Sequence, residues 1–370
     1  LKSDGPTTVV FELKDGNADF PTLVSDYHLP IFPAKDGGGI DWQSGVGSGA
    51  FSLEKFQPGI SAKLKRNPNY HKNNMPYFDE VEFLCVPDVA GRMNAVIGGE
   101  VHFSAACDLK TLGMLKKSPD IDILEVTGIG HYTFAMDTTV APFNDPDVRL
   151  ALKYAIDRQA IVDKVFLGHA APGNDNPIAP SVKYGIDPEP KHVYDVEKAK
   201  FHLKKAGLDS LAVDLSVADA AFTGAVDAAV LYADSAQKAG IDITVKRESN
   251  DGYWDAVWMK RPWCAVYWSG RATCDWMFST TYAADAAWND TKWKNPRFNE
   301  LLSAARSELD DTKRAGMYAE MQQLVHDDSG TIVLVFNNYV NALSKKIGHG
   351  EIVGTWDMDG LKMAERWWFA

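Results

Sequence analysis

The spacing of apolar and polar positions predicts that strands dominate the first 137 residues. Short apolar runs rich in β-branched and aromatic residues predict strands, whereas apolar residues three and four positions apart predict helices. A turn at Gln57-Pro58-Gly59 separates two of the strands. The predicted strands are 8–13, the two on either side of that turn within 51–67, 81–88, 101–106, 121–126 and 131–137. The predicted helices are 90–98 and 109–117, and the strand–helix–strand order over 81–106 indicates a parallel pairing.

Helices and strands alternate after residue 145. Asp145-Pro146-Asp147 opens a helix with a proline and acidic residues in its first turn, and Asp157 caps the next helix. Residues 172–190 are rich in proline, glycine and asparagine and predict a loop. Further helices are predicted at 195–206, 225–238, 253–259, 297–309 and 312–327, and strands at 213–217, 241–246, 264–268 and 331–338. The last strand is apolar through most of its length, which is typical of a strand buried on both faces.

Length and composition narrow the class of protein. A chain of 370 residues exceeds what one core ordinarily serves, so two or more lobes are expected. The net charge of −12 argues against a general nucleic-acid binder, which needs positive charge to neutralise phosphates. No apolar run approaches the roughly 20 residues that span a bilayer. Leu1 is not a start methionine, so either a signal peptide has been removed or the chain is part of something longer.

The cysteines and histidines do not form a metal-binding pattern. The four cysteines lack CxxC spacing and no histidine cluster accompanies them, so neither a zinc site nor another metal or cofactor is expected. An even number of cysteines fits one or two disulfides in an oxidising compartment. It fits buried free thiols equally well. The cysteines are Cys85, Cys107, Cys264 and Cys274.

Aromatic residues gather in one stretch, PWCAVYWSGRATCDWMF, at 262–278. Seven of the eleven tryptophans lie between Trp254 and Trp293. Tryptophan at this density marks either a core or a recognition surface. A carbohydrate hydrolase that uses this tryptophan-rich face is an alternative, with Asp275, Asp285 and Glu248 nearby in sequence. However, no GxSxG or HExxH motif occurs, and nothing nominates an acid and a nucleophile among the many carboxylates.

Several segments in order resemble the family 5 extracellular solute-binding proteins, the dipeptide and oligopeptide receptors of ABC importers. The first is GSGAFSL with a following Pro-Gly and RNPNY, within 47–70. The second is PFND with VRLAL and YAIDR, within 142–158. The remaining segments are FDEV (78–81), Pro87-Asp88, Arg92 to Val101, YDVEKAK (194–200) and AGL (206–208). Each segment is weak alone, but their order and spacing make the match specific.

The resemblance implies an α/β, two-lobe periplasmic-binding-protein architecture of the type II, flytrap kind. Family members carry a longer N-terminal part, so the first lobe is expected to be incomplete. The expected division is 1–137 for the partial first lobe, 138–344 for the second lobe, and 345–370 for a C-terminal return to the first lobe. The resemblance also implies a periplasmic, or extracellular and membrane-associated, monomer. Such a receptor would bind a small-molecule ligand, deliver it to the permease subunits of an ABC transporter, and bind no nucleic acid.

The resemblance places the ligand site at Trp268-Ser269-Gly270-Arg271. In dipeptide and oligopeptide receptors the matching segment carries an aspartate that pairs with the peptide ammonium, and Arg271 occupies that position here. An arginine would repel an ammonium and suit a carboxylate, sulfonate or phosphate. A peptide-like, opine-like or anionic solute is therefore expected, held by hinge closure without catalysis. Alternatively, Arg271 is a structural residue paired with Asp275 or Glu248.

Four further residues are expected in the ligand site. Asp219 and Phe222 lie where dipeptide receptors use an arginine for the terminal carboxylate, and Glu248 and Trp276 complete the set. If Arg271 and Asp219 both lie at these expected positions, the positive and negative charges of the site are exchanged relative to a peptide receptor. A bridge between Cys264 and Cys274 would pre-organise the loop that carries Arg271.

Overall fold

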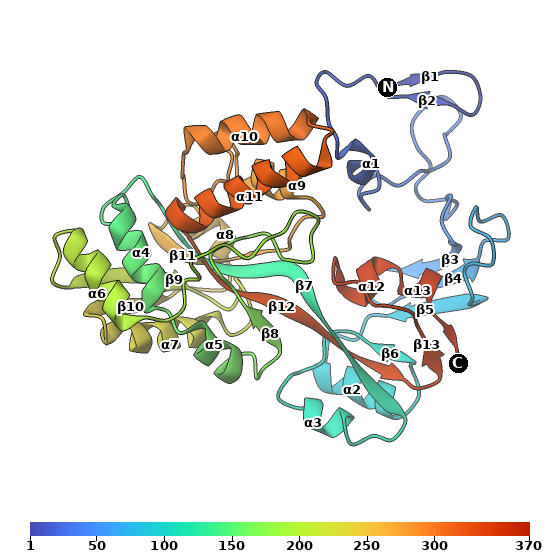
Figure 1. The fold of residues 1–370 in the computed structure, drawn as a ribbon. Coiled ribbons are helices and arrows are strands. Elements are labelled where there is room, and N and C mark those ends of the chain that lie inside the picture. The colour runs from blue at the N-terminus through green and yellow to red at the C-terminus, as the bar shows by residue number, and fades with distance from the viewer. The chain divides into compact units, whose positions relative to one another are not determined.

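The computed structural model describes residues 1–370 as two compact units (Figure 1). The larger unit comprises 1–25, 129–165 and 172–336. The smaller unit comprises 26–128, 166–171 and 337–370. The first 25 residues belong to the larger unit and residues 26–128 to the smaller one. The predicted boundaries at 137 and 344 instead put residues 1–137 in one lobe. The assignment of residues 1–137, 138–344 and 345–370 to lobes stays a prediction.

A twisted mixed sheet organises the larger unit. Its strand order is β10-β9-β11-β7-β12, continuing to β6, with β8 paired to β12. The two long strands belong to both units, since residues 121–128 of β7 and 337–344 of β12 lie in the smaller unit, as does β6. The neighbours β10, β9 and β11 run parallel, and β7 runs antiparallel to β11. The bounds are β6 (Phe103–Ser104), β7 (Ile121–Met136), β8 (Ala170–Pro172), β9 (Leu211–Val217), β10 (Ile241–Arg247), β11 (Trp263–Trp268) and β12 (Thr331–Ser344). Residues 331–336 of β12 are all buried, so the predicted strand with two covered faces is confirmed.

Helices cover both faces of this sheet. Figure 1 shows α10 and α11 on one side of the central strands and α5 and α7 on the other. The predicted caps are confirmed, since the Asp145 and Asp157 side chains accept backbone N–H bonds at the starts of α4 and α5. The helices are α4 (Pro146–Ala155), α5 (Arg158–Lys164), α6 (Val196–Lys205), α7 (Ala225–Gln237), α8 (Tyr253–Ala256), α9 (Cys274–Thr281), α10 (Pro296–Ser307) and α11 (Asp311–Asp328). The short elements β1 (Lys2–Ser3), β2 (Val9–Val10) and α1 (Phe20–Leu23) also belong to this unit.

The smaller unit contains a three-stranded antiparallel sheet and two small apolar clusters. The sheet order is β3-β4-β5, and the predicted turn at 57–59 connects its first two strands. One cluster packs α2 and α3 under β7 and β12, and the other surrounds Trp367. The bounds are β3 (Phe51–Gln57), β4 (Ser61–Arg66), β5 (Glu80–Leu84), α2 (Val89–Ile97), α3 (Leu112–Leu115), β13 (Ile347–Gly348), α12 (Asp357–Leu361), α13 (Met363–Arg366) and β14 (Trp368–Phe369).

Three sequence-based expectations about strands are wrong. The strands of the 81–106 segment are not a parallel pair, because β5 pairs with β4 and β6 pairs with β12, both antiparallel. The two strands expected at 121–126 and 131–137 form one continuous strand, β7, since the intervening TGIG stays extended. The strand expected at 8–13 is reduced to two exposed residues, Val9 and Val10. No helix is both long and apolar enough to cross a membrane.

Candidate functional site

The expected ligand segment begins where β11 ends. Arg247 lies opposite Val217 in the parallel register, so β9 and β10 end at the same level of the sheet. Ser216 lies opposite Cys264, and β11 therefore continues past those ends to Trp268. Carboxyl ends of parallel strands are where open α/β sheets commonly bind ligands.

The loop after β11 needs glycine at position 270. Gly270 has φ of +78°, in the left-handed region that favours glycine. A Cβ atom at this position would lie 2.5 Å from the Ile129 carbonyl oxygen on β7. The loop thus passes directly against β7 and turns there, which places the next residue, Arg271, beyond the carboxyl end of β11.

Arg271 is half-buried and held by its own loop and by helix α9. Its Nη1 donates to the Gly270 carbonyl oxygen at 2.6 Å and to the Ser269 hydroxyl at 3.3 Å. Its guanidinium carbon lies 5.5 Å from the centroid of the Trp276 ring. Thr273 caps α9 by accepting the Trp276 backbone N–H, which fixes the backbone from which that ring projects. The structure therefore brings together Ser269, Gly270, Arg271 and Trp276.

Asp275 and Glu248, the two carboxylates expected as alternative structural partners of Arg271, instead lie close to other arginines. Asp275 forms an ion pair with Arg306 at 3.2 Å. Glu248 accepts the Ser216 hydroxyl and lies 3.6 Å from Arg261.

A buried histidine lies beside this loop and was not identified from the sequence. His131 on β7 is directly opposite Trp268 and is fully buried, and neither of its ring nitrogens has a hydrogen-bond partner. Burial lowers the pKa of His131 to about 4, the nearby Ile129 backbone opposes this, and the charge of Arg271 lowers the pKa further. His131 is therefore neutral at pH 7. Only the strand pairing reveals it, because it lies far from the tryptophan-rich stretch in sequence.

The expected site residues divide between two faces of the sheet. Opposite residues of an antiparallel pair share a face, so Trp268 and His131 point to one face, and Tyr267 and Tyr132 point to the other. Phe222 stacks on Tyr132, with ring centroids 4.3 Å apart and planes 4° apart, and so belongs to the face opposite Trp268.

The other two expected residues lie in separate settings. The exposed Asp219 accepts the Val226 backbone N–H at 3.4 Å, at the start of α7. Glu248 lines an open hollow of about 650 Å³ over β9 and β10, and none of residues 268–276 lines it. The same hollow holds the Lys246–Asp214 ion pair and the exposed Arg261, so its wall carries both charge signs.

Two further tryptophans and a buried carboxyl group adjoin Trp268. The Trp258 and Trp288 ring centroids lie 6.2 and 6.3 Å from that of Trp268. The Trp258 indole Nε1 donates to Asp290 at 3.4 Å, and Asp290 is 7% exposed. Burial raises the pKa of Asp290 to about 7, although the hydrogen bonds from the two indoles oppose the rise. No motif in the sequence marks Asp290, which lies only within the tryptophan-rich range from Trp254 to Trp293.

The four cysteines form no disulfide bonds in the structure. Cys264 and Cys274 are both buried, and burial raises the pKa of each to about 12. No bridge therefore spans the loop that holds Arg271, whose conformation rests on Gly270 and on the cap of α9.

One cluster of potential metal ligands occurs in the larger unit, at His192, His326 and Asp327. The two imidazole rings stack with centroids 3.8 Å apart and planes 13° apart. The lone pairs of stacked rings run side by side instead of converging on one ion, and His192 already bonds Asp175 at 2.8 Å. The geometry fits a buried hydrogen-bond network better than a metal site.

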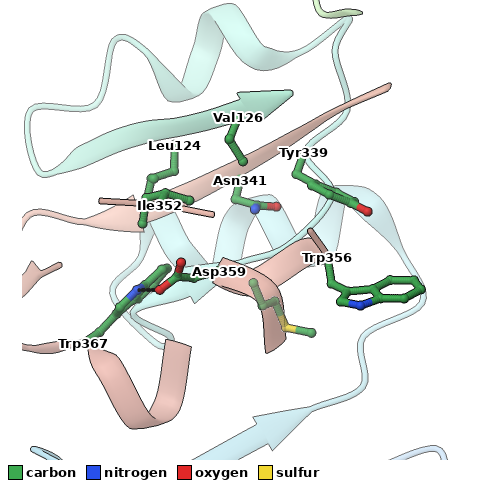
Figure 2. Close-up of a pocket in the computed structure, with 9 residues that line it drawn as sticks. Leu124, Val126, Tyr339, Asn341, Ile352, Trp356, Asp359 and Trp367 are labelled. Carbon is green, nitrogen blue, oxygen red and sulfur yellow. Dashed lines mark hydrogen bonds between the residues drawn. The ribbon is translucent and has the colours of Figure 1, made fainter. Parts of the chain in front are cut away.

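The smaller unit has a water-sized hollow under its two long strands. Figure 2 shows side chains of β7 and β12 above it and the C-terminal segment with Trp356 and Asp359 below. Asp359 accepts the Val353 backbone N–H, the Arg366 guanidinium and the Trp367 indole N–H, so its charge is satisfied. The hollow, with a volume of about 10 Å³, is too small for a solute larger than water.

Curated relatives share about a quarter of the residues. The glutathione-binding protein GsiB of Salmonella paratyphi A is 27% identical over 316 residues, which cover 82% of this chain and 61% of that protein. The chain thus spans less than two thirds of the length of this relative.

Solved structures of solute-binding proteins share the fold. DppA of Helicobacter pylori, in complex with the peptide STSA, matches with a TM-score of 0.69 at 23% identity, over 86% of this chain and 63% of that one. AgaA of A. tumefaciens R10, in complex with agropinic acid, matches with a TM-score of 0.67 at 22% identity, over 87% and 67%. These likenesses confirm the expected α/β, two-lobe class of fold.

A family model identifies the family to which the sequence belongs. The model of the bacterial extracellular solute-binding proteins, family 5 Middle, matches residues 1–290. This match includes the two motif runs within 47–70 and 142–158 and the whole loop around Arg271. The chain therefore belongs to family 5 of the bacterial extracellular solute-binding proteins.

Proposed function

We propose that this protein is the solute-binding receptor of an ABC importer and captures a small organic solute without breaking a bond. The observation that carries the proposal is the family match over residues 1–290. In this account the receptor is a periplasmic, or extracellular and membrane-associated, monomer that presents its loaded form to the permease subunits. Closure of two lobes over the solute would exclude water and strengthen each polar contact inside.

The solute carries an acidic group that binds Arg271. A guanidinium presents parallel N–H donors that match a carboxylate, sulfonate or phosphate. Stacking on Trp276 and bonding to the Gly270 carbonyl restrict its rotamers before the ligand arrives, which lowers the entropic cost of binding. The neutral His131 beside it adds no second positive charge and leaves Arg271 as the principal cation of this loop.

The solute binds at the carboxyl end of β11 in this proposal, on the face of the sheet to which Trp268 points. Trp268, Ser269, Gly270, Arg271 and Trp276 form the contact surface. Asp219 and Phe222 support the adjacent edge, since one holds the start of α7 and the other stacks on Tyr132. Glu248 acts in the neighbouring hollow and holds Ser216 and Arg261.

A thermal-shift panel tests the proposal on the full chain. The panel contains glutathione, the peptide STSA and agropinic acid, as the ligands that the names of relatives state, together with simple carboxylates, sulfonates and phosphate. A solute that binds only the folded protein raises the melting temperature of the protein by mass action. Calorimetry then gives the dissociation constant of that solute. Unchanged concentration of the solute after prolonged incubation would agree with binding without turnover.

A pair of arginine variants tests the site. Arg271→Gln should weaken binding of the acidic solute by about a hundredfold or more, as expected when one partner of a partly desolvated charge pair is removed. Lys238→Gln is the matched control, because Lys238 is exposed at the C-terminal end of α7, away from the loop after β11, and its loss changes the net charge equally. Equal affinities of the two variants would remove Arg271 from the site, and a panel without any shift would contradict the receptor proposal.

A further inference from the structure

Three tryptophans of the larger unit form a triangle that reaches the surface. Their ring centroids lie 6.2 Å apart for Trp258 and Trp268, 6.3 Å for Trp258 and Trp288, and 6.3 Å for Trp268 and Trp288. The corresponding ring planes meet at 70°, 63° and 44°. Trp268 is 6% exposed whereas Trp288 is 48% exposed, so one corner of the triangle faces solvent. A cation placed over the triangle lies within roughly 6 Å of all three ring centroids, the range of cation–π attraction.

A carboxyl group without a cationic partner lies against the triangle. Asp290 accepts the Trp258 indole N–H, is 7% exposed, and takes part in none of the ion pairs of the chain. A buried carboxylate without a cation is costly, and such groups are normally paired. Burial raises the pKa of Asp290 to about 7, which shows how poorly the surrounding protein supports its charge. A ligand cation nearby would favour the ionised form.

The hydrogen bond from Trp258 to Asp290 should also make the Trp258 ring more electron-rich. A carboxylate that accepts the indole N–H of Trp258 pushes electron density into that ring, because hydrogen-bonded groups polarise one another in a low-dielectric surrounding. A more electron-rich face attracts a cation more strongly. In the subsite proposed below, Asp290 acts through Trp258, the ring whose N–H it accepts.

We propose that Trp258, Trp268 and Trp288 form a subsite for a quaternary or alkylated ammonium group of the transported solute, with Asp290 supplying negative charge beside the rings. This inference rests on the proposed receptor function. Trp268 directly precedes Ser269, Gly270 and Arg271, so one solute can reach both the triangle and the guanidinium. The solute is then a zwitterion, with its acidic group at Arg271 and its ammonium group at the triangle.

Choline and its uncharged isostere 3,3-dimethylbutan-1-ol test the subsite directly. The two molecules have the same shape and differ in the positive charge, so their difference in affinity isolates the cation. Quenching of tryptophan fluorescence and calorimetry should both show choline binding about tenfold tighter. Trp288→Leu removes the exposed corner and should weaken choline binding about tenfold, and Asp290→Asn should weaken it several-fold. Trp42→Leu, at an exposed tryptophan of the smaller unit, is the matched control and should leave choline binding unchanged.

The outcomes separate this inference from the receptor proposal. Equal binding of the two probes, or choline affinity that Trp288→Leu and Asp290→Asn leave intact, shows that the triangle is only packed apolar surface. If the acidic solutes of the panel still bind through Arg271, the receptor proposal stands and the ammonium subsite is refuted. If choline binds through Trp288 while no acidic solute binds, the subsite stands and the anion assignment fails.

Discussion

The guanidinium carbon of Arg271 lies 5.5 Å from the ring centroid of Trp276. The two residues belong to one short segment, in which β11 ends, the chain turns at Gly270 and α9 begins. The contact holds a charged group in a defined direction beyond the carboxyl end of β11. An unanchored arginine would lose side-chain entropy on binding an anion, whereas this one has lost part of it already.

The fork geometry of Arg271 should matter as well as its charge. Arg271→Lys keeps the positive charge but loses the parallel donors and the planar stack on Trp276. We expect acidic solutes to bind about tenfold more weakly to this variant, midway between the native protein and Arg271→Gln. Calorimetry of the three proteins with the same solute checks the order. Affinity equal to that of the native protein would mean that a point charge suffices.

Gly270 should be sensitive to a methyl group for two reasons. Gly270→Ala places a side chain in left-handed backbone and drives its Cβ to 2.5 Å from the Ile129 carbonyl oxygen. Gly207→Ala is the matched control, since Gly207 has φ of +77° with no atom within 4 Å of its Cβ position. We expect Gly207→Ala to cost about 1 kcal/mol in the free energy of unfolding and Gly270→Ala about 3 kcal/mol or more. Urea unfolding measures both, and equal costs would contradict the close approach of the loop to β7.

The ends of β11 and α9 show how far the sequence predicts the site. The strand at 264–268 follows from local pattern, the expected role of Arg271 follows from the family resemblance and stays a prediction, and the structure brings Arg271 to Trp276. Helix α9 was not predicted from the sequence, because cysteine, tryptophan and threonine are weak helix formers. Its helix forms because a Thr273 cap and the buried Met277 and Phe278 outweigh that preference.

Long-range pairing explains what the sequence could not show. His131 reaches the site only because β7 pairs with β11 so that it lies opposite Trp268. The same register sends Phe222 and Tyr132 to the other face of the sheet. The prediction of a parallel pair over 81–106 was wrong for a similar reason. The two strands pair with other strands of the chain, β5 with β4 and β6 with β12. A one-residue change in register exchanges the two faces, and no local pattern fixes it here.

The carboxyl group of Asp290 should make stability depend on pH. Burial raises its pKa in the folded protein to about 7, above the value near 3.9 expected when unfolded. Its contribution to stability is therefore fully present below about pH 4 and is lost as the pH rises towards and through 7. The neighbouring Tyr282 and Cys264 do not titrate in that range.

The comparison of the native protein with Asp290→Asn isolates this effect. The difference in their free energies of unfolding should shift by about 2–4 kcal/mol in favour of the variant between pH 4 and pH 8. Urea unfolding at several pH values measures the shift. A difference that stays constant with pH would mean that Asp290 keeps an ordinary pKa.

The buried Arg158–Asp175–His192 cluster should be far more important for stability than an exposed pair of equal length. Arg158 and His192 bond the Asp175 carboxylate at 2.6 and 2.8 Å. Burial alone would raise the pKa of Asp175, but the charge of Arg158 and the hydrogen bond from His192 hold it well below its ordinary range. Asp175→Asn should cost about 3–5 kcal/mol, because Arg158 is left buried and unpaired.

An exposed pair provides the control for that variant. Lys183 and Asp311 also lie 2.6 Å apart, but both are exposed. Asp311→Asn should lower stability far less than Asp175→Asn does, because water already screens the exposed pair. Urea unfolding at pH 7 compares the two variants, and similar losses would contradict the assignment of Asp175 as the centre of a buried network.

Calorimetric titration of the full chain with the strongest acidic solute of the panel tests the central claim most directly. The account predicts a saturable heat of binding with one site per chain, about a hundredfold weaker in Arg271→Gln and unchanged in Lys238→Gln. An affinity that Arg271→Gln leaves intact would contradict the claim that a small acidic solute binds at Arg271.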